Sequence, residues 1–189
     1  GVQTCALPIS KTLGNFSDIE GVIYCNDAPI KINWKKIKTF KNRDGLITPE
    51  GFYTKRNSPR FPTMFVVHHD VAFSSRQAFE TLIQRKLSIH FLIDNDGTIY
   101  QTLDTKHICS HATSVNPTSI GVEISNPFYA KYNLIYRKKR QPERQVLTND
   151  FVHGQRIEPH LGYYPEQINA LDRKSTRLNS SHLVISYAV

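Results

Sequence analysis

Two histidines and an aspartate stand at the end of a predicted buried strand, in the stretch FVVHHD of residues 65–70. The continuous apolar run before them predicts that strand. Because side chains alternate across a strand, His68 and His69 should point to opposite faces. A neutral imidazole at the exit of a rigid strand suits a zinc ion that keeps one position for water. Zinc lowers the pKa of that water, so His68 is a candidate ligand of a hydrolytic metal centre.

A glutamate is the second candidate. Glu123 lies in SIGVEIS, residues 119–125, among apolar neighbours where a carboxylate is unusual. It is either paired structurally with a Lys or Arg, or it works chemically by accepting a proton from a metal-bound water. The chemical hypothesis requires His68 and Glu123 in one sheet, facing one cleft that His111 also lines, with His69 turned to another face. The structural alternative predicts an ion-paired Glu123 and a His68 bonded to backbone.

The other histidines between residues 10 and 171 are weaker candidates, because a lone histidine is more often structural than a ligand. His90 sits inside a predicted strand, where it bonds within the sheet or supports the site. His107 and His111 lie in the loop before SIGVEIS and are ligands, substrate contacts or neither. His153 and His160 lie in a polar loop and are expected to be ordinary surface residues.

Several regular elements must position these residues. The segment Ser74–Lys86 predicts an amphipathic helix capped by Ser74 or Ser75. Residues 88–103 predict two strands joined at Asn95-Asp96-Gly97. SIGVEIS predicts another strand, and Pro165 opens a further helix. The order predicts an α/β or α+β domain with a mixed central β-sheet flanked by helices.

The segment before residue 61 carries less information. Residues 21–26 and 30–34 alternate like short strands. They form either a small β extension or the leading edge of the main domain. We therefore divide the chain into an N-terminal extension at residues 10–60 and a main domain at residues 61–171.

Both ends of the chain are expected to be foreign to the fold. The tail DRKSTRLNSSHLVISYAV, residues 172–189, matches an in-frame translation of a common sequencing adapter. The head GVQTCALPI, residues 1–9, matches the reverse complement of the same adapter. We expect both natural termini to be missing, which leaves any signal peptide, and therefore the localisation, open.

The composition sets loose limits. The formal net charge is +8, which provides solubility or attracts a polyanion such as nucleic acid or an anionic cell wall. The basic residues are scattered apart from YRKKR at residues 136–140, and no zinc-finger, RNA-binding or basic-zipper signature is present. No apolar run approaches the ~20 residues that span a bilayer. The three cysteines indicate neither a disulfide scaffold nor a cysteine-rich zinc site.

The stretch from residue 65 to residue 126 resembles the zinc-dependent N-acetylmuramoyl-L-alanine amidases, a superfamily that includes phage lysozyme-like amidases and the peptidoglycan recognition proteins. Each matching motif is weak alone, but their order over this stretch is specific. The motifs are VVHH at Val66, SIHFLIDNDGTIYQ at Ser88, HA at His111 and NPTSIGVEI at Asn116.

The resemblance implies a function and a set of residue roles. It implies a peptidoglycan hydrolase that acts on the bacterial cell wall, as a phage lysin or a secreted enzyme. The bond cleaved joins the lactyl group of N-acetylmuramic acid to L-alanine. His68 would bind Zn²⁺, Glu123 would be the general base, and His111 would lie by the substrate groove. His69 and Asn116 are further substrate-contact candidates.

The resemblance also implies residues that this chain lacks. Some family members place a tyrosine where Ile89 stands, so the chain is similar to the members that use glutamate. The second and third zinc ligands, a His and an Asp or Cys, are expected beyond Leu171, as is a lysine used by some members. The chain as printed is therefore expected to hold one of the ligands and to lack useful activity.

Two rival functions remain. Peptidoglycan recognition proteins of the same fold bind muropeptide without zinc, and the ligands beyond Leu171 would distinguish such a binding module from an enzyme. A nucleic-acid-binding protein would need a continuous basic face and salt-sensitive binding. We expect neither nucleic acid nor a membrane as a partner, and the sequence does not indicate an oligomeric state.

Overall fold

A computed structural model describes residues 21–56, 62–152, 154–178 and 183–186, with no account of the side chains of residue 152 or of those after residue 172. The helices are α1 (Ser75–Gln84), α2 (Asn133–Lys138) and α3 (Pro165–Leu178), with 3-10 turns η1 (Thr113–Thr118) and η2 (Ala130–Tyr132). The strands are β1 (Gly21–Cys25), β2 (Ala28–Ile32), β3 (Ile37–Thr39), β4 (Tyr53–Lys55), β5 (Met64–His69), β6 (Phe91–Ile93), β7 (Ile99–Gln101), β8 (His107–Cys109), β9 (Ser119–Ile124), β10 (Val146–Leu147), β11 (Phe151–Val152), β12 (Gln155–Arg156), β13 (His160–Leu161) and β14 (Leu183–Ser186).

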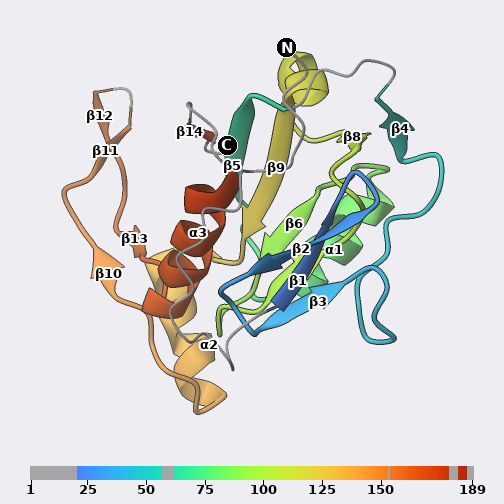
Figure 1. Cartoon of the computed structure of the whole chain (residues 1–189). Helices are drawn as coiled ribbons and strands as arrows, with labels where there is room; N and C mark the ends of the chain where they lie inside the picture. The colour runs from blue at the N-terminus through green and yellow to red at the C-terminus, as the bar shows by residue number, and fades with distance from the viewer. Residues whose placement is uncertain (1–20, 57–61, 153, 179–182, 187–189) are drawn as a thin grey trace.

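A six-stranded mixed sheet forms the centre of the domain, in the order β14-β5-β9-β6-β7-β3. The pairs β14–β5, β5–β9, β9–β6 and β7–β3 are parallel, and β6–β7 is antiparallel. Helix α3 and the β1–β2 hairpin cover one face, and α1 lies against the other (Figure 1). This arrangement confirms the predicted mixed sheet flanked by helices.

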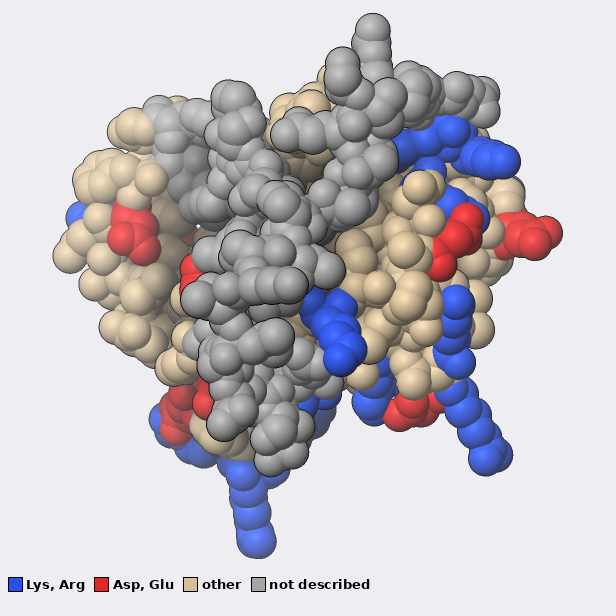
Figure 2. Space-filling view, in the orientation of Figure 1, with Lys and Arg blue, Asp and Glu red and all other residues tan. Residues whose placement is uncertain are grey.

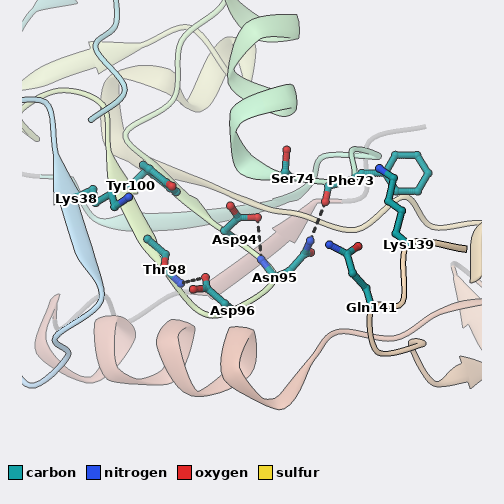
Figure 3. Close-up of a pocket in the computed structure, with 10 residues that line it drawn as sticks. All are labelled: Lys38, Phe73, Ser74, Asp94, Asn95, Asp96, Thr98, Tyr100, Lys139 and Gln141. Carbon is teal, nitrogen blue, oxygen red and sulfur yellow. Dashed lines mark hydrogen bonds between the residues drawn. The ribbon is translucent and has the colours of Figure 1, made fainter. Parts of the chain in front are cut away.

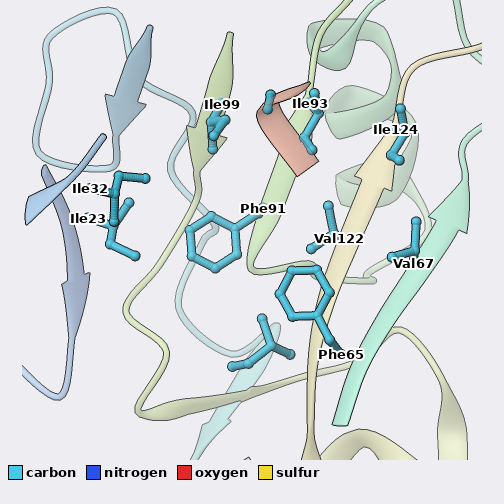
Figure 4. Close-up of a cluster of buried hydrophobic side chains, with 11 residues drawn as sticks. Ile23, Ile32, Phe65, Val67, Phe91, Ile93, Ile99, Val122 and Ile124 are labelled. Carbon is cyan, nitrogen blue, oxygen red and sulfur yellow. The ribbon is translucent and has the colours of Figure 1, made fainter. Parts of the chain in front are cut away.

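Each face of the sheet carries its own hydrophobic cluster. Beneath α3 and the hairpin, apolar side chains of β5, β9, β6 and β7 meet Ile23, Ile32 and Ala170 (Figure 4). Beneath α1, Leu92 and Tyr100 pack with Ala78 and other residues. Burial of a large aliphatic or aromatic side chain contributes about 1.5–3 kcal/mol, so both faces hold the sheet in place.

Local signals determine the predicted elements. The Ser74 hydroxyl accepts a hydrogen bond from the Gln77 N–H at 3.3 Å, which confirms Ser74 as the N-cap of α1. Between β6 and β7, Gly97 has a φ of +78°, a conformation that costs glycine little. The helix cap and the turn each depend on residues close together in the chain, which is why the sequence predicts them.

The segment before residue 61 contributes to the main sheet. Strand β3 pairs with β7 at the sheet edge, and the β1–β2 hairpin places Ile23 and Ile32 in the larger core cluster. Gln101 joins the hairpin to the sheet, because its side chain bonds both the N–H and the C=O of Tyr24. These contacts favour the alternative in which this segment is the leading edge of the main domain.

A long segment between β9 and α3 is anchored through one buried arginine. Arg144 is 3% exposed, and its guanidinium donates to the carbonyls of Gly162 and Ser125, to the side-chain oxygens of Gln167 and Asn95, and to the Tyr136 hydroxyl. All of these acceptors are neutral. The guanidinium also lies 4.1 Å from the Tyr164 ring centroid.

The backbone of the tail continues the fold. Helix α3 runs without a break past residue 172, and β14 pairs in parallel with β5. The side chains of both segments after residue 172 are outside the description, so the absence of the tail from the core stays a prediction. The head at residues 1–9 lies outside the described residues. No helix in the described ranges is long and apolar enough to cross a bilayer.

Positive charge is distributed in separate places. On the face shown in Figure 2, Lys and Arg side chains stand apart from one another, with Asp and Glu among them. Several cations are paired, including Lys38 with Asp44, Lys106 with Asp27 and Arg137 with Glu143. Among the described residues that this view shows, acidic side chains interrupt the basic ones.

Candidate functional site

The parallel pairing of β5 and β9 places the two main candidates next to each other. The register aligns His68 with Glu123. Aligned residues of neighbouring strands project from the same face of a sheet, so both side chains point toward the side that α1 covers. Both are nearly buried, at 7% and 8% exposure. The prediction that they share one sheet and one face is confirmed.

The environment of Glu123 differs from that of a structural ion pair. Burial, together with the negative charge of Asp70, raises the pKa of Glu123 to about 8, and Arg85 opposes the shift. Its Oε2 atom is buried and has no hydrogen-bond partner among the described residues. Unpaired buried carboxyl oxygens are rare in native proteins because each costs roughly 1–3 kcal/mol, and they call for a specific explanation.

A chain of side chains leads away from His68. Its Nε2 lies 2.9 Å from Nδ1 of His111, and Nε2 of His111 lies 3.1 Å from the Ser119 hydroxyl. Burial lowers the pKa of His68, and burial with the nearby charges of His68 and Arg56 lowers the pKa of His111 to about 3. Both rings are therefore neutral near pH 7. The partner of His68 is thus a side chain, whereas the structural alternative predicted backbone.

Two residues of the NPTSIG stretch give His111 its position. The Asn116 side-chain oxygen accepts from the N–H groups of His111 and Ala112, at 3.1 and 2.6 Å. Gly121 leaves room for the ring, because a Cβ there would lie 2.7 Å from Nδ1 of His111. The structure thus brings His111 to His68 as expected and gives Asn116 a supporting contact.

His69 belongs to the opposite side of the sheet, as strand alternation predicts. Its Nδ1 lies 3.3 Å from the Tyr163 hydroxyl, and its ring contacts Phe128 edge-on. Burial, with the charges of His160 and Arg144, lowers the pKa of His69 to about 4. The structure does not bring His69 to the His68–Glu123 side, and its Nε2 is buried without a partner in the described part of the chain.

One surface assignment was wrong. His160 lies in β13, with its side chain only 12% exposed, its ring stacked on Phe128 and its Nε2 3.2 Å from Asp150. Contacts with Phe128 and Asp150 leave half-buried a histidine that the polar sequence around it placed in solvent. His153 lies outside the described residues.

Two further histidines, His90 and His107, make contacts within the fold. His90 accepts the Gly121 N–H at Nδ1, and its Nε2 lies 3.0 Å from the His107 carbonyl, which confirms the expected bonding within the sheet. His107 packs its ring against Tyr53. Sequence reasoning missed the supporting residues Ser119 and Gly121, although both stand in the quoted NPTSIGVEI motif.

The described residues do not complete a zinc site. Within them there is no group of three or more His, Cys, Asp or Glu side chains that could hold a metal ion. His68 and His111 supply two imidazoles, but their facing nitrogens are bonded to each other. A catalytic zinc requires three protein ligands, so these residues alone do not fit the ion.

The raised pKa of Glu123 predicts that stability depends on pH. Between the unfolded pKa of about 4.3 and the folded value, the folded chain holds a proton that the unfolded chain has lost. This stability is full below about pH 4 and is lost as the pH rises toward about 8. Glu123→Gln, which stays neutral, should therefore be more stable than the original chain by roughly 1–2 kcal/mol at pH 8, and by less at pH 5.

Urea unfolding at pH 5, 6.5 and 8 measures this difference. The matched control is Glu80→Gln, an exposed carboxylate on α1. Asp70, whose pKa burial raises to about 7, adds a pH dependence that Glu80→Gln shares with the original chain. Equal pH slopes for Glu123→Gln and the original chain would contradict the assignment of a buried, protonated Glu123.

Comparison with known proteins identifies the family of this chain. A family model described as N-acetylmuramoyl-L-alanine amidase matches residues 57–186. No curated protein matched. Among solved structures, the endolysin amidase LysCS from Clostridium intestinale is 22% identical, with 79% of this chain and 80% of that chain covered and a TM-score of 0.47.

Two further solved structures are complexes with muramic-acid peptides. AmpDh3 from Pseudomonas aeruginosa, in complex with an anhydromuramic pentapeptide, is 18% identical over 76% of this chain and 55% of that one, with a TM-score of 0.44. AmiD from E. coli, in complex with an anhydro-N-acetylmuramic acid peptide, is 18% identical over 71% and 51%, with a TM-score of 0.42.

Proposed function

The chain belongs to the N-acetylmuramoyl-L-alanine amidase family, and from this premise we propose that it hydrolyses the amide bond between the lactyl group of N-acetylmuramic acid and the L-alanine of peptidoglycan. One observation carries the proposal. His68 and Glu123 are aligned on neighbouring parallel strands, and Glu123 keeps a buried carboxyl oxygen without a partner in the described chain. Such an oxygen is available for proton transfer.

Glu123 is proposed to move the proton. A general acid–base group works best when its pKa lies near the working pH, and the pKa of Glu123 is about 8. The ionised carboxylate takes a proton from the attacking water, and the resulting acid returns it to the leaving amine. Burial maintains the shifted pKa, so the same feature that costs stability provides the reactivity.

The other candidate residues are proposed to bind. His68 is proposed as one zinc ligand, with two more ligands in the natural sequence that follows Leu171. Because the described residues do not complete that site, no step is assigned to the metal. His111, held by Asn116 and Ser119, is proposed to line the substrate cleft. For His69, a substrate contact would have to come from the opposite side of the sheet.

A non-catalytic module that binds muropeptide is the second candidate. The observation that favours it is the absence, among the described residues, of a complete group of metal-binding side chains. Such a protein would bind the same peptidoglycan fragments and release no product.

Digestion of purified peptidoglycan distinguishes the candidates. We expect the chain with its natural sequence restored after Leu171 to release free L-alanine amino termini, and a zinc chelator to abolish the release. The chain as printed should bind soluble muropeptide without turnover. New reducing ends in place of new amino termini would contradict the amidase proposal. Robust zinc-dependent turnover by the printed chain would contradict the assignment of the missing ligands.

A further inference from the structure

A polar hollow of about 410 Å³ lies away from His68 and Glu123, between the start of α1, the β6–β7 turn and the end of α2 (Figure 3). Ser74, at the start of α1, lines the hollow. Arg85, at the end of α1, is near enough to Glu123 for its charge to lower the pKa of that carboxyl group. Ten helical residues span about 15 Å, so the hollow and the candidate active site lie near opposite ends of this helix.

The floor of the hollow is rigid. Asp94 Oδ1 accepts from the N–H groups of Asn95 and Ser75, at 2.9 and 3.2 Å. Asn95 is fixed in turn, because its amide donates to the Phe73 carbonyl and its oxygen accepts from Arg144. Asp94 Oδ2 has no hydrogen-bond partner among the described residues, which leaves one oriented acceptor open to a ligand.

Charges in the lining balance. Lys38, Lys139, Asp94 and Asp96 all line the hollow, giving two ammonium groups and two carboxylates. Lys38 is paired with Asp44 at 2.7 Å and Asp96 with Lys36 at 3.6 Å, both partners outside the lining, which leaves Lys139 against Asp94. The hollow therefore has no excess charge to select an anion or a cation, and it favours a neutral ligand.

Uncharged hydrogen-bonding groups complete the lining, together with two aromatic side chains. Ser74, Thr98 and Gln141 offer hydroxyl and amide groups. Tyr100 and Phe73 provide aromatic surface, and the Tyr100 hydroxyl can both donate and accept. The volume falls within the range of about 300–1,000 Å³ typical of small-molecule sites.

We propose that this hollow binds a neutral saccharide, with sugar hydroxyls donating to Asp94 Oδ2 and exchanging hydrogen bonds with Gln141 and Tyr100. The choice of an N-acetylated hexosamine as the sugar rests on the proposed function, since peptidoglycan glycan strands consist of such units. The hollow then holds a glycan strand at a second place, separate from the residues proposed for amide hydrolysis.

Titration of the ¹⁵N-labelled full chain with triacetylchitotriose tests the proposal by NMR. This sugar carries no stem peptide, so the enzyme has no lactyl–alanine bond to cleave, and the titration measures binding alone. We expect amide shifts at residues 94–98 with a Kd of roughly 1–10 mM. Asp94→Asn, which keeps the oxygen that caps α1, should weaken binding at least about fivefold, and the exposed Gln141→Ala about threefold. Glu80→Gln should leave the affinity unchanged.

Three results would overturn the inference. The first is the absence of amide shifts at about 20 mM probe, a concentration that would detect even weak binding. The second is a set of shifts centred on the His111 loop. The third is an equal affinity for Asp94→Asn, Gln141→Ala and the original chain. Shifts at residues 94–98 caused by glycine and not by the saccharide would assign the hollow to amino-acid zwitterions instead. Failure of peptidoglycan hydrolysis would leave the binding result intact, so the two proposals fail separately.

Discussion

Replacing Glu123 by glutamine should lower amide hydrolysis by about 10²–10⁴-fold in the active form of the enzyme, the typical contribution of a positioned acid–base group. Glutamine preserves the shape of the side chain and its place on β9, but it cannot accept a proton from water. The Michaelis constant should change little, because the loss concerns the transition state. Release of free L-alanine amino termini from peptidoglycan at several substrate concentrations measures both quantities.

Two controls separate chemistry from folding. Glu80→Gln changes an exposed carboxylate on α1, the helix that covers the face of the sheet where Glu123 lies, and should leave the rate unchanged. Glu123→Gln itself should be more stable than the original chain at pH 8, so lost activity together with gained stability identifies a working residue. An active Glu123→Gln variant would remove the glutamate from the mechanism and leave the family membership untouched.

Replacing Arg144 by methionine should lower the free energy of unfolding by roughly 3–5 kcal/mol, because it breaks a buried hydrogen-bond network and leaves its acceptors unsatisfied. Five neutral oxygens currently share this guanidinium, among them the carbonyls of Gly162 and Ser125. Methionine fills much of the volume but donates nothing. Urea unfolding followed by circular dichroism measures the loss.

The matched variants are Arg144→Lys and Arg76→Met. Lysine keeps the charge but lacks the planar fork, so it should recover only a minor part of the loss. Arg76 is an exposed arginine on α1, and its replacement should change stability by less than about 0.5 kcal/mol. A loss below about 1 kcal/mol for Arg144→Met would show that water replaces the guanidinium at these acceptors.

The sequence predicted those parts of the fold that depend on short-range signals. The apolar run before His68, the Ser74 cap and the Asn95-Asp96-Gly97 turn each act over a few residues, and each element appears where expected. The shared face of His68 and Glu123 depends on the register between β5 and β9, which the structure provides and strand alternation alone does not fix.

The remaining features depend on contacts between distant residues. Arg144 lies in a polar stretch, and only the folded chain surrounds it with acceptors from the residue after β9, the β6–β7 turn and α3. His160 is half-buried because Phe128 and Asp150 contact it. No periodicity or motif in the sequence predicts such contacts, so sequence analysis placed His160 in solvent and did not identify Arg144.

The central position of the β5–β9 pair determines whether the candidate site is disrupted by local opening or by global unfolding. His68 and Glu123 are backbone neighbours in the middle of the sheet, between β14 on one side and β6 on the other. Amides in such central strands exchange their hydrogens only when the whole domain opens, whereas loops and termini exchange by local fluctuations. Glu123, the proposed proton-transfer residue, and His68 should therefore keep their places until global unfolding, while the His111 loop that borders them can open on its own.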